Sequence, residues 1–182
     1  MSEKDTFNTL RPVLKRQYHA ALTMLKQAIE RCPEELWIDD QYANQFWQLA
    51  YHTLYYTHLY LQPDAASFTP WEHHQTYIQD LDEFRAPTEI QDLCEHPHRP
   101  PQTGELYSKS QVLEYWGVCD VMVDDCVKML DLGASTCGFP WYDMTKLEHQ
   151  FVTVRHIQHH TAQLGVRLRE ASGIAIDWIG SG

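Results

Sequence analysis

Apolar side chains recur alternately four and three residues apart in the first long segment of the chain, Thr6 to Arg31. This spacing places one apolar stripe along an α-helix. Because a residue that precedes proline disfavours the helical conformation, Cys32-Pro33 is expected to end this helix. A second helix is predicted from Tyr42 to Gln62, where large apolar residues occur on nearly all sides, as is typical of a helix covered by its neighbours.

Two further helices are predicted in the second half of the chain, and each has an N-terminal capping signal. The third extends from Ser108 to Leu132 and the fourth from Thr145 to Ser172 or the residue before it. Each begins with Ser or Thr followed three residues later by Gln or Glu, which is the pattern of a capping box. Glycines at 133 and 173 are expected to stop them.

A long connection separates the second and third helices, from Pro63 to Tyr107. Six of the nine prolines fall in it and exclude a long helix, although its apolar residues suffice to pack a short helix over the protein. Such a long crossover allows the second and third helices to run parallel. The tail from Ile174 to Ile179 is the one segment that suits a strand. The chain is therefore predicted to be all-α, a single four-helix-bundle domain spanning residues 1–182 with a long crossover between helices 2 and 3.

Composition and charge exclude several classes of protein. Fourteen Lys and Arg against 25 Asp and Glu give a formal net charge of −11 over 182 residues, which repels nucleic acid and anionic membrane surfaces. The sequence has no run of about 18 apolar residues that could span a bilayer and no apolar signal segment, so we expect a cytoplasmic protein. The five cysteines form no C-x-x-C pair and are expected to be reduced thiols.

The eleven histidines include a spacing that suits a metal ion. His156 and His160 are four residues apart on the fourth helix, which places both imidazoles on one face. His52 lies midway along the most apolar helix and is the best third ligand. Both observations have an ordinary alternative. His156 and His160 could be a solvated or hydrogen-bonded pair, and His52 could be a core histidine hydrogen-bonded to a tyrosine. Burying three unpaired imidazoles is costly, however, whereas one ion satisfies all three.

A fourth histidine, His149, shares the face of His156 seven residues earlier on the same helix. At the usual helical rise it lies about 10 Å along the axis, too far to bind the same ion directly. We therefore expect it in the second shell or at the entrance of the site. Imidazole ligands favour zinc, nickel, iron or copper over magnesium or calcium.

Two short segments carry a family resemblance. Ala50-Tyr51-His52-Thr53-Leu54, followed about a hundred residues later by His156-x-x-x-His160-x-x-Gln163-Leu164, resembles the DinB-like superfamily of metal-binding four-helix bundles. Ala162 stands where many relatives have glycine. The resemblance implies that the three histidines hold a divalent metal, commonly zinc or nickel, while the preference of imidazole ligands leaves iron possible. Some members are transferases or isomerases that use bacillithiol, mycothiol or a related thiol.

Two functions remain open at this point. The first is a metal-dependent thiol S-transferase or hydrolase, in which the ion activates a low-molecular-weight thiol or water toward an electrophile. Tyr56, one turn after His52, would then line the pocket of the electrophile, and Gln163 would support the ligands of the fourth helix. The second is a non-catalytic module that binds a metal or small ligand or serves dimerisation. We expect a homodimer that binds small molecules.

Other chemically interesting residues have simpler interpretations. His73 and His74 in the crossover are expected in a solvated loop rather than in a lid over the metal. His96-Pro97-His98 is expected to form an exposed turn. Cys119 and Cys126 lie on the apolar stripe of the third helix, where cysteine usually fills the core.

Overall fold

Helices make up the regular secondary structure in the part of the protein that the structure describes. A computed structural model of the chain describes residues 3–81 and 104–182. The elements are α1 (Glu3–Arg31), α2 (Glu34–Trp37), α3 (Phe46–Tyr60), the 3-10 helix η1 (Ala65–Ser67), α4 (Lys109–Met129) and α5 (Lys146–Ser172).

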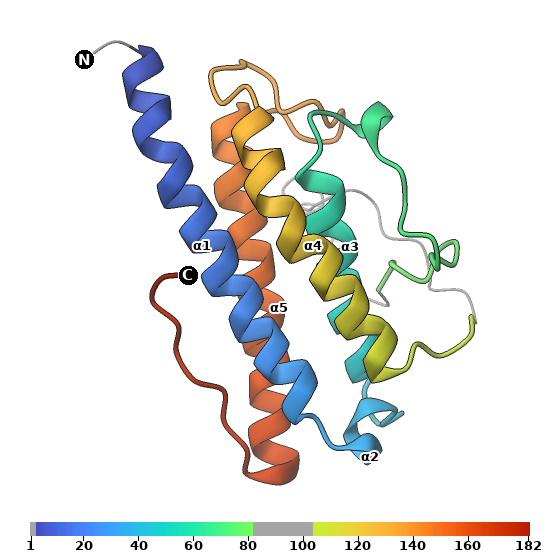
Figure 1. Cartoon of the computed structure of the whole chain (residues 1–182). Coiled ribbons are helices and arrows are strands. Elements are labelled where there is room, and N and C mark those ends of the chain that lie inside the picture. Colours follow the sequence, from blue (N-terminus) through green and yellow to red (C-terminus); the bar gives the residue numbers. More distant parts are fainter. Residues whose placement is uncertain (1–2, 82–103) are drawn as a thin grey trace, which may run out of the picture.

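The four long helices pack side by side as a bundle. In Figure 1, α1 and α5 run from the top of the view to the bottom, and α3 and α4 run from the bottom to the top. Both α1 and α3 pack against α4 and α5. The all-α fold is therefore confirmed, with α3 and α4 parallel and separated by a long stretch of chain. None of the helices in the described part is long and apolar enough to cross a membrane.

The capping signals define the start of two long helices. The Ser108 side chain accepts a hydrogen bond from the Gln111 amide, and the Gln111 side chain accepts one from the Ser108 amide at 2.9 Å, so the capping box is complete. Thr145 Oγ1 accepts from the Glu148 amide at 3.2 Å. Gly173 ends α5 in the left-handed conformation, with φ of 71°.

Other boundaries differ from the prediction. The second long helix begins at Phe46 rather than Tyr42, because Gln45 and Gln48 form a reciprocal cap that is rarely a helix signal. The short helix α2 was not predicted. The tail at 174–179 is not a strand, since it has no regular secondary structure. It returns along α1 instead, and the Gly182 amide donates to Arg16 O at 3.1 Å.

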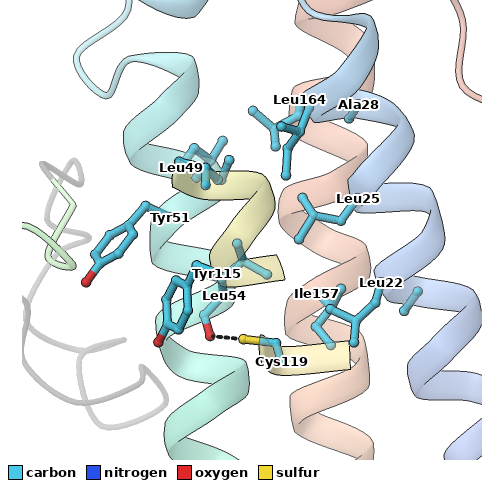
Figure 2. Packing of buried hydrophobic residues seen from close by; sticks show 14 of the residues in the cluster. Leu22, Leu25, Ala28, Leu49, Tyr51, Leu54, Tyr115, Cys119, Ile157 and Leu164 are labelled. Atoms are coloured by element: carbon cyan, nitrogen blue, oxygen red, sulfur yellow. Dashed lines mark hydrogen bonds between the residues drawn. The ribbon is translucent and has the colours of Figure 1, made fainter. Parts of the chain in front are cut away.

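The main core lies between the four long helices. Figure 2 shows that Leu22 of α1 lies beside Ile157 of α5, while Leu54 of α3 lies beside Cys119 of α4. The Cys119 thiol donates to Leu54 O at 3.5 Å, and burial raises its pKa. Its expected role as a core residue is therefore confirmed. The four described cysteines are free thiols, whereas Cys94 lies outside the described residues.

A smaller aromatic cluster occupies the end of the bundle where α3 finishes and α5 begins. Its buried members are Tyr56, Leu59, Tyr60, Cys137 and Phe139. The connection from α4 to α5 is held there by a backbone bond from the Ala65 amide to Gly138 O at 3.1 Å. Because Tyr56 and Tyr60 belong to the C-terminal half of α3, the aromatic cluster adjoins the part of α3 that follows His52.

Candidate metal centre

Three histidines converge between α3 and α5. His52 Nε2 lies 3.0 Å from His156 Nε2, which lies 3.1 Å from His160 Nε2. Their relative exposures are 0, 6 and 4%, respectively. The structure thus brings together the three residues that the sequence singles out, in a buried group that could hold a metal ion.

The helices explain this convergence. The spacing of four residues places His156 and His160 on one face of α5, with ring centroids 4.5 Å apart. That face packs against α3, where His52 lies near the middle of the helix. All three imidazoles are therefore carried by rigid elements, as a preorganised ligand set requires.

The hydrogen bonds of the outer ring nitrogens define the protonation of two of the rings. His52 Nδ1 lies 2.7 Å from the backbone oxygen of Gln79, and His160 Nδ1 lies 2.8 Å from Gln163 Oε1. Because these oxygens can only accept, each Nδ1 carries the hydrogen. In the neutral rings, Nε2 of His52 and of His160 then presents a lone pair to the centre of the group.

His156 lies between these two lone pairs. Its Nε2 can carry at most one hydrogen, which can be directed at only one neighbour with good geometry. One of the two short nitrogen contacts is therefore unfavourable in the neutral, metal-free group. A shared ion removes the conflict, since two imidazole nitrogens bound at about 2.1 Å to one ion lie about 3.0–3.4 Å apart. The observed separations fall at the short end of this range.

An aromatic ring lies beside the group and connects it to a buried carboxylate. The ring of Tyr56 is 4.7 Å from that of His52 and 5.8 Å from that of His156. Its hydroxyl donates to Asp80 Oδ1 at 3.5 Å, and Asp80 is buried. The carboxylate of Asp80 was missed in the sequence, because a single acidic residue in a proline-rich crossover has no distinguishing spacing.

His149 does not line an entrance from solvent. It is 0% exposed in the aromatic cluster, with its ring 4.6 Å from Tyr60, 4.9 Å from Phe139 and 5.1 Å from Tyr142. Neither ring nitrogen has a hydrogen-bond partner in the described part of the chain. Burial, together with the nearby charge of Lys146, lowers the pKa of His149 to about 3. The expectation of an entrance residue is therefore wrong, and a second-shell role stays a prediction.

The histidines of the crossover differ from one another. His73 is exposed as expected, near the similarly exposed Glu72 and Glu114. His74 is instead half-buried, and its Nδ1 lies 2.7 Å from the Tyr51 hydroxyl, so it is not a solvated loop residue. The expected turn at 96–98 lies outside the described residues.

The described part of the chain thus has a buried group of three imidazoles beside the ring of Tyr56, whose hydroxyl donates to the buried carboxylate of Asp80. Comparison of the chain with protein-family models, with curated proteins and with solved structures gives no match.

Proposed function

We propose that the protein binds one divalent transition-metal ion through His52, His156 and His160, and that it is a DinB-like metalloprotein. The observation that carries the proposal is the convergence of three Nε2 atoms, two of which present lone pairs because Gln79 and Gln163 accept from Nδ1. Three neutral nitrogen donors suit zinc or nickel first, with iron as a further option.

We further propose that the site is catalytic, as a metal-dependent thiol transferase or hydrolase. An ion held by these three neutral imidazoles would keep its full charge and would supply a Lewis acid that lowers the pKa of a thiol or water nucleophile. In a transfer reaction the sulfur or oxygen of this nucleophile would form a bond to an electrophilic carbon as the bond from that carbon to its leaving group breaks. The leaving group would depart with the electron pair, and the proton of the thiol or water would pass to a base. Tyr56 supplies an aromatic wall, and the carboxylate of Asp80 supplies a hydrogen-bond acceptor. A nearby acidic group favours the enzyme over a bare binding module.

Metal analysis of protein purified without a histidine tag tests the binding. We expect about one equivalent of metal per chain, and its loss in His52→Ala, His156→Ala and His160→Ala. The matched control is His159→Ala, an exposed position on the same helix. A wild-type protein that stays metal-free after incubation with zinc, nickel and iron would refute the proposal.

Activity is tested separately on the fully loaded protein. A metal-dependent conjugation of a small thiol with an electrophile, abolished by His52→Ala, would support the transferase. Hydrolysis of activated esters under the same conditions would support the use of water. Absence of any metal-dependent rate would instead favour the non-catalytic module that binds a metal or a small ligand.

A further inference from the structure

The hydrogen-bond acceptor of His52 comes from outside the helices. It is the backbone oxygen of Gln79, within the segment from Trp71 to Leu81, which we call the 71–81 segment. A backbone carbonyl has no side-chain freedom, so its position depends on the path of the segment. Whatever holds the 71–81 segment in place therefore also orients the imidazole of His52.

Tyr107 holds one part of this segment. Its hydroxyl donates to His73 O at 2.6 Å and accepts from the Gln75 amide at 2.9 Å, so it binds the backbone on both sides of His74. Burial raises the pKa of Tyr107, which keeps the hydroxyl protonated. Tyr107 is itself fixed, because Trp37 Nε1 donates to its backbone oxygen at 2.9 Å.

Tyr51 ties the same segment to α3. Its hydroxyl lies 2.7 Å from His74 Nδ1, and its ring stacks on that of Tyr107 with centroids 4.6 Å apart. Tyr51 directly precedes His52, so the helical turn that carries the metal ligand also carries an anchor for the segment. Ile78 and Leu81, on either side of Gln79, are buried in the core and fix the far end.

One residue between the anchors and Gln79 has an unusual backbone conformation. Tyr77 has φ of 70°, in the left-handed region that residues other than glycine rarely adopt. Such a conformation persists only where the surrounding contacts enforce it. The path that brings the Gln79 carbonyl to His52 is therefore maintained by the anchors rather than by local preference.

We propose that Tyr107 and Tyr51 are positioning residues of the metal centre, which act on His52 through the 71–81 segment without touching the ion. The inference rests on the proposed function, because it assigns a metal-ligand role to His52. Loss of either hydroxyl should loosen the segment and remove the acceptor that keeps the hydrogen on Nδ1. Outer contacts of this kind typically change metal affinity about 10- to 100-fold.

The first measurement is the zinc dissociation constant of Tyr107→Phe and Tyr51→Phe, by competition with a chromophoric chelator. We expect about tenfold weaker binding for each variant. The matched control is Tyr18→Phe, which also removes a buried hydroxyl, one that donates to Gln150 Oε1 at 2.8 Å away from the 71–81 segment. This control should bind zinc within about twofold of the wild type. Equal losses in all three variants, or no loss in the first two, would overturn the proposal.

The second measurement distinguishes failure of this inference from failure of the proposed function. Nitrogen-15 NMR of the metal-free protein reports which ring nitrogen of His52 carries the hydrogen. We expect a single Nδ1–H form in the wild type and in Tyr18→Phe, and a mixture of forms in Tyr107→Phe. If the wild type bound no zinc, the proposed function would fail. A difference between the His52 spectra of the wild type and Tyr107→Phe would then still support the positioning role. An unchanged His52 spectrum in Tyr107→Phe would overturn that role whatever the affinity.

Discussion

Replacing His149 with leucine should make the protein less sensitive to acid. His149 is wholly buried among aromatic rings, and its pKa is lowered from 6.5 to about 3, first by burial and then by the charge of Lys146. The unfolded chain therefore binds a proton at this position below about pH 6.5, whereas the folded chain binds it only near pH 3. Stability is consequently lost as the pH falls through this window.

The size of the effect follows from the two pKa values. Between pH 7.5 and pH 5.0, protonation of the unfolded state alone lowers the free energy of unfolding by about 2 kcal/mol, since each pKa unit corresponds to about 1.4 kcal/mol. His149→Leu removes this contribution. The variant can also differ from the wild type in packing at neutral pH, but that difference does not depend on pH.

The assay is urea unfolding, followed by circular dichroism at pH 7.5 and 5.0 with a chelator present. We expect the acid-induced loss of stability to be about 2 kcal/mol smaller in His149→Leu than in the wild type. His159→Leu, at an exposed position of the same helix, should keep the wild-type dependence. Equal pH dependence in His149→Leu and the wild type would refute the reasoning.

Three further outcomes are expected. Gly138→Ala should destabilise the fold by about 2 kcal/mol, because φ is 88° and a Cβ there would collide with Pro63 O. Gly117→Ala, on the open surface of α4, should instead stabilise the fold by about 0.5–1 kcal/mol. Urea unfolding measures both changes. Gln163→Ala should weaken zinc binding about tenfold, because it removes the hydrogen-bond acceptor of His160 Nδ1. The loss should be smaller than in His160→Ala, which removes a ligand; equal losses of zinc affinity by chelator competition would contradict this. Chelation should leave the helical circular dichroism signal intact, since the core forms without the ion; a signal lost with the metal would make the site structural.

Periodicity and caps predict the helices well where the signals are local. Ser108 and Thr145 begin their helices as expected, and Gly173 ends the last one, because each acts through contacts within one turn. The start of α3 was less predictable, since its cap is a pair of glutamines, Gln45 and Gln48. The tail resembled a strand by composition, yet the described chain offers it no strand partner.

The site was predictable in its ligands but not in its supports. His156 and His160 follow from helical spacing, and His52 follows from its place in a covered helix together with the family resemblance. The acceptor of His52 is a backbone oxygen, which any residue at position 79 would supply, so no sequence signal marks it. His149 shares the spacing of the ligands, but the loop that buries it comes from long-range packing that periodicity does not describe.

The separation of the ligands along the chain has a consequence for the order of assembly. His52 and His156 are 104 positions apart, so a ribosome delivers the first ligand long before the other two. Until α5 emerges, the nascent protein has one imidazole of the group, and the parts of α1 and α3 that pack against α5 are uncovered. The group therefore forms in the last stage of folding, when the C-terminal helix docks. An ion bound there would slow the dissociation of α5 from the folded bundle, and it would not be needed to start folding.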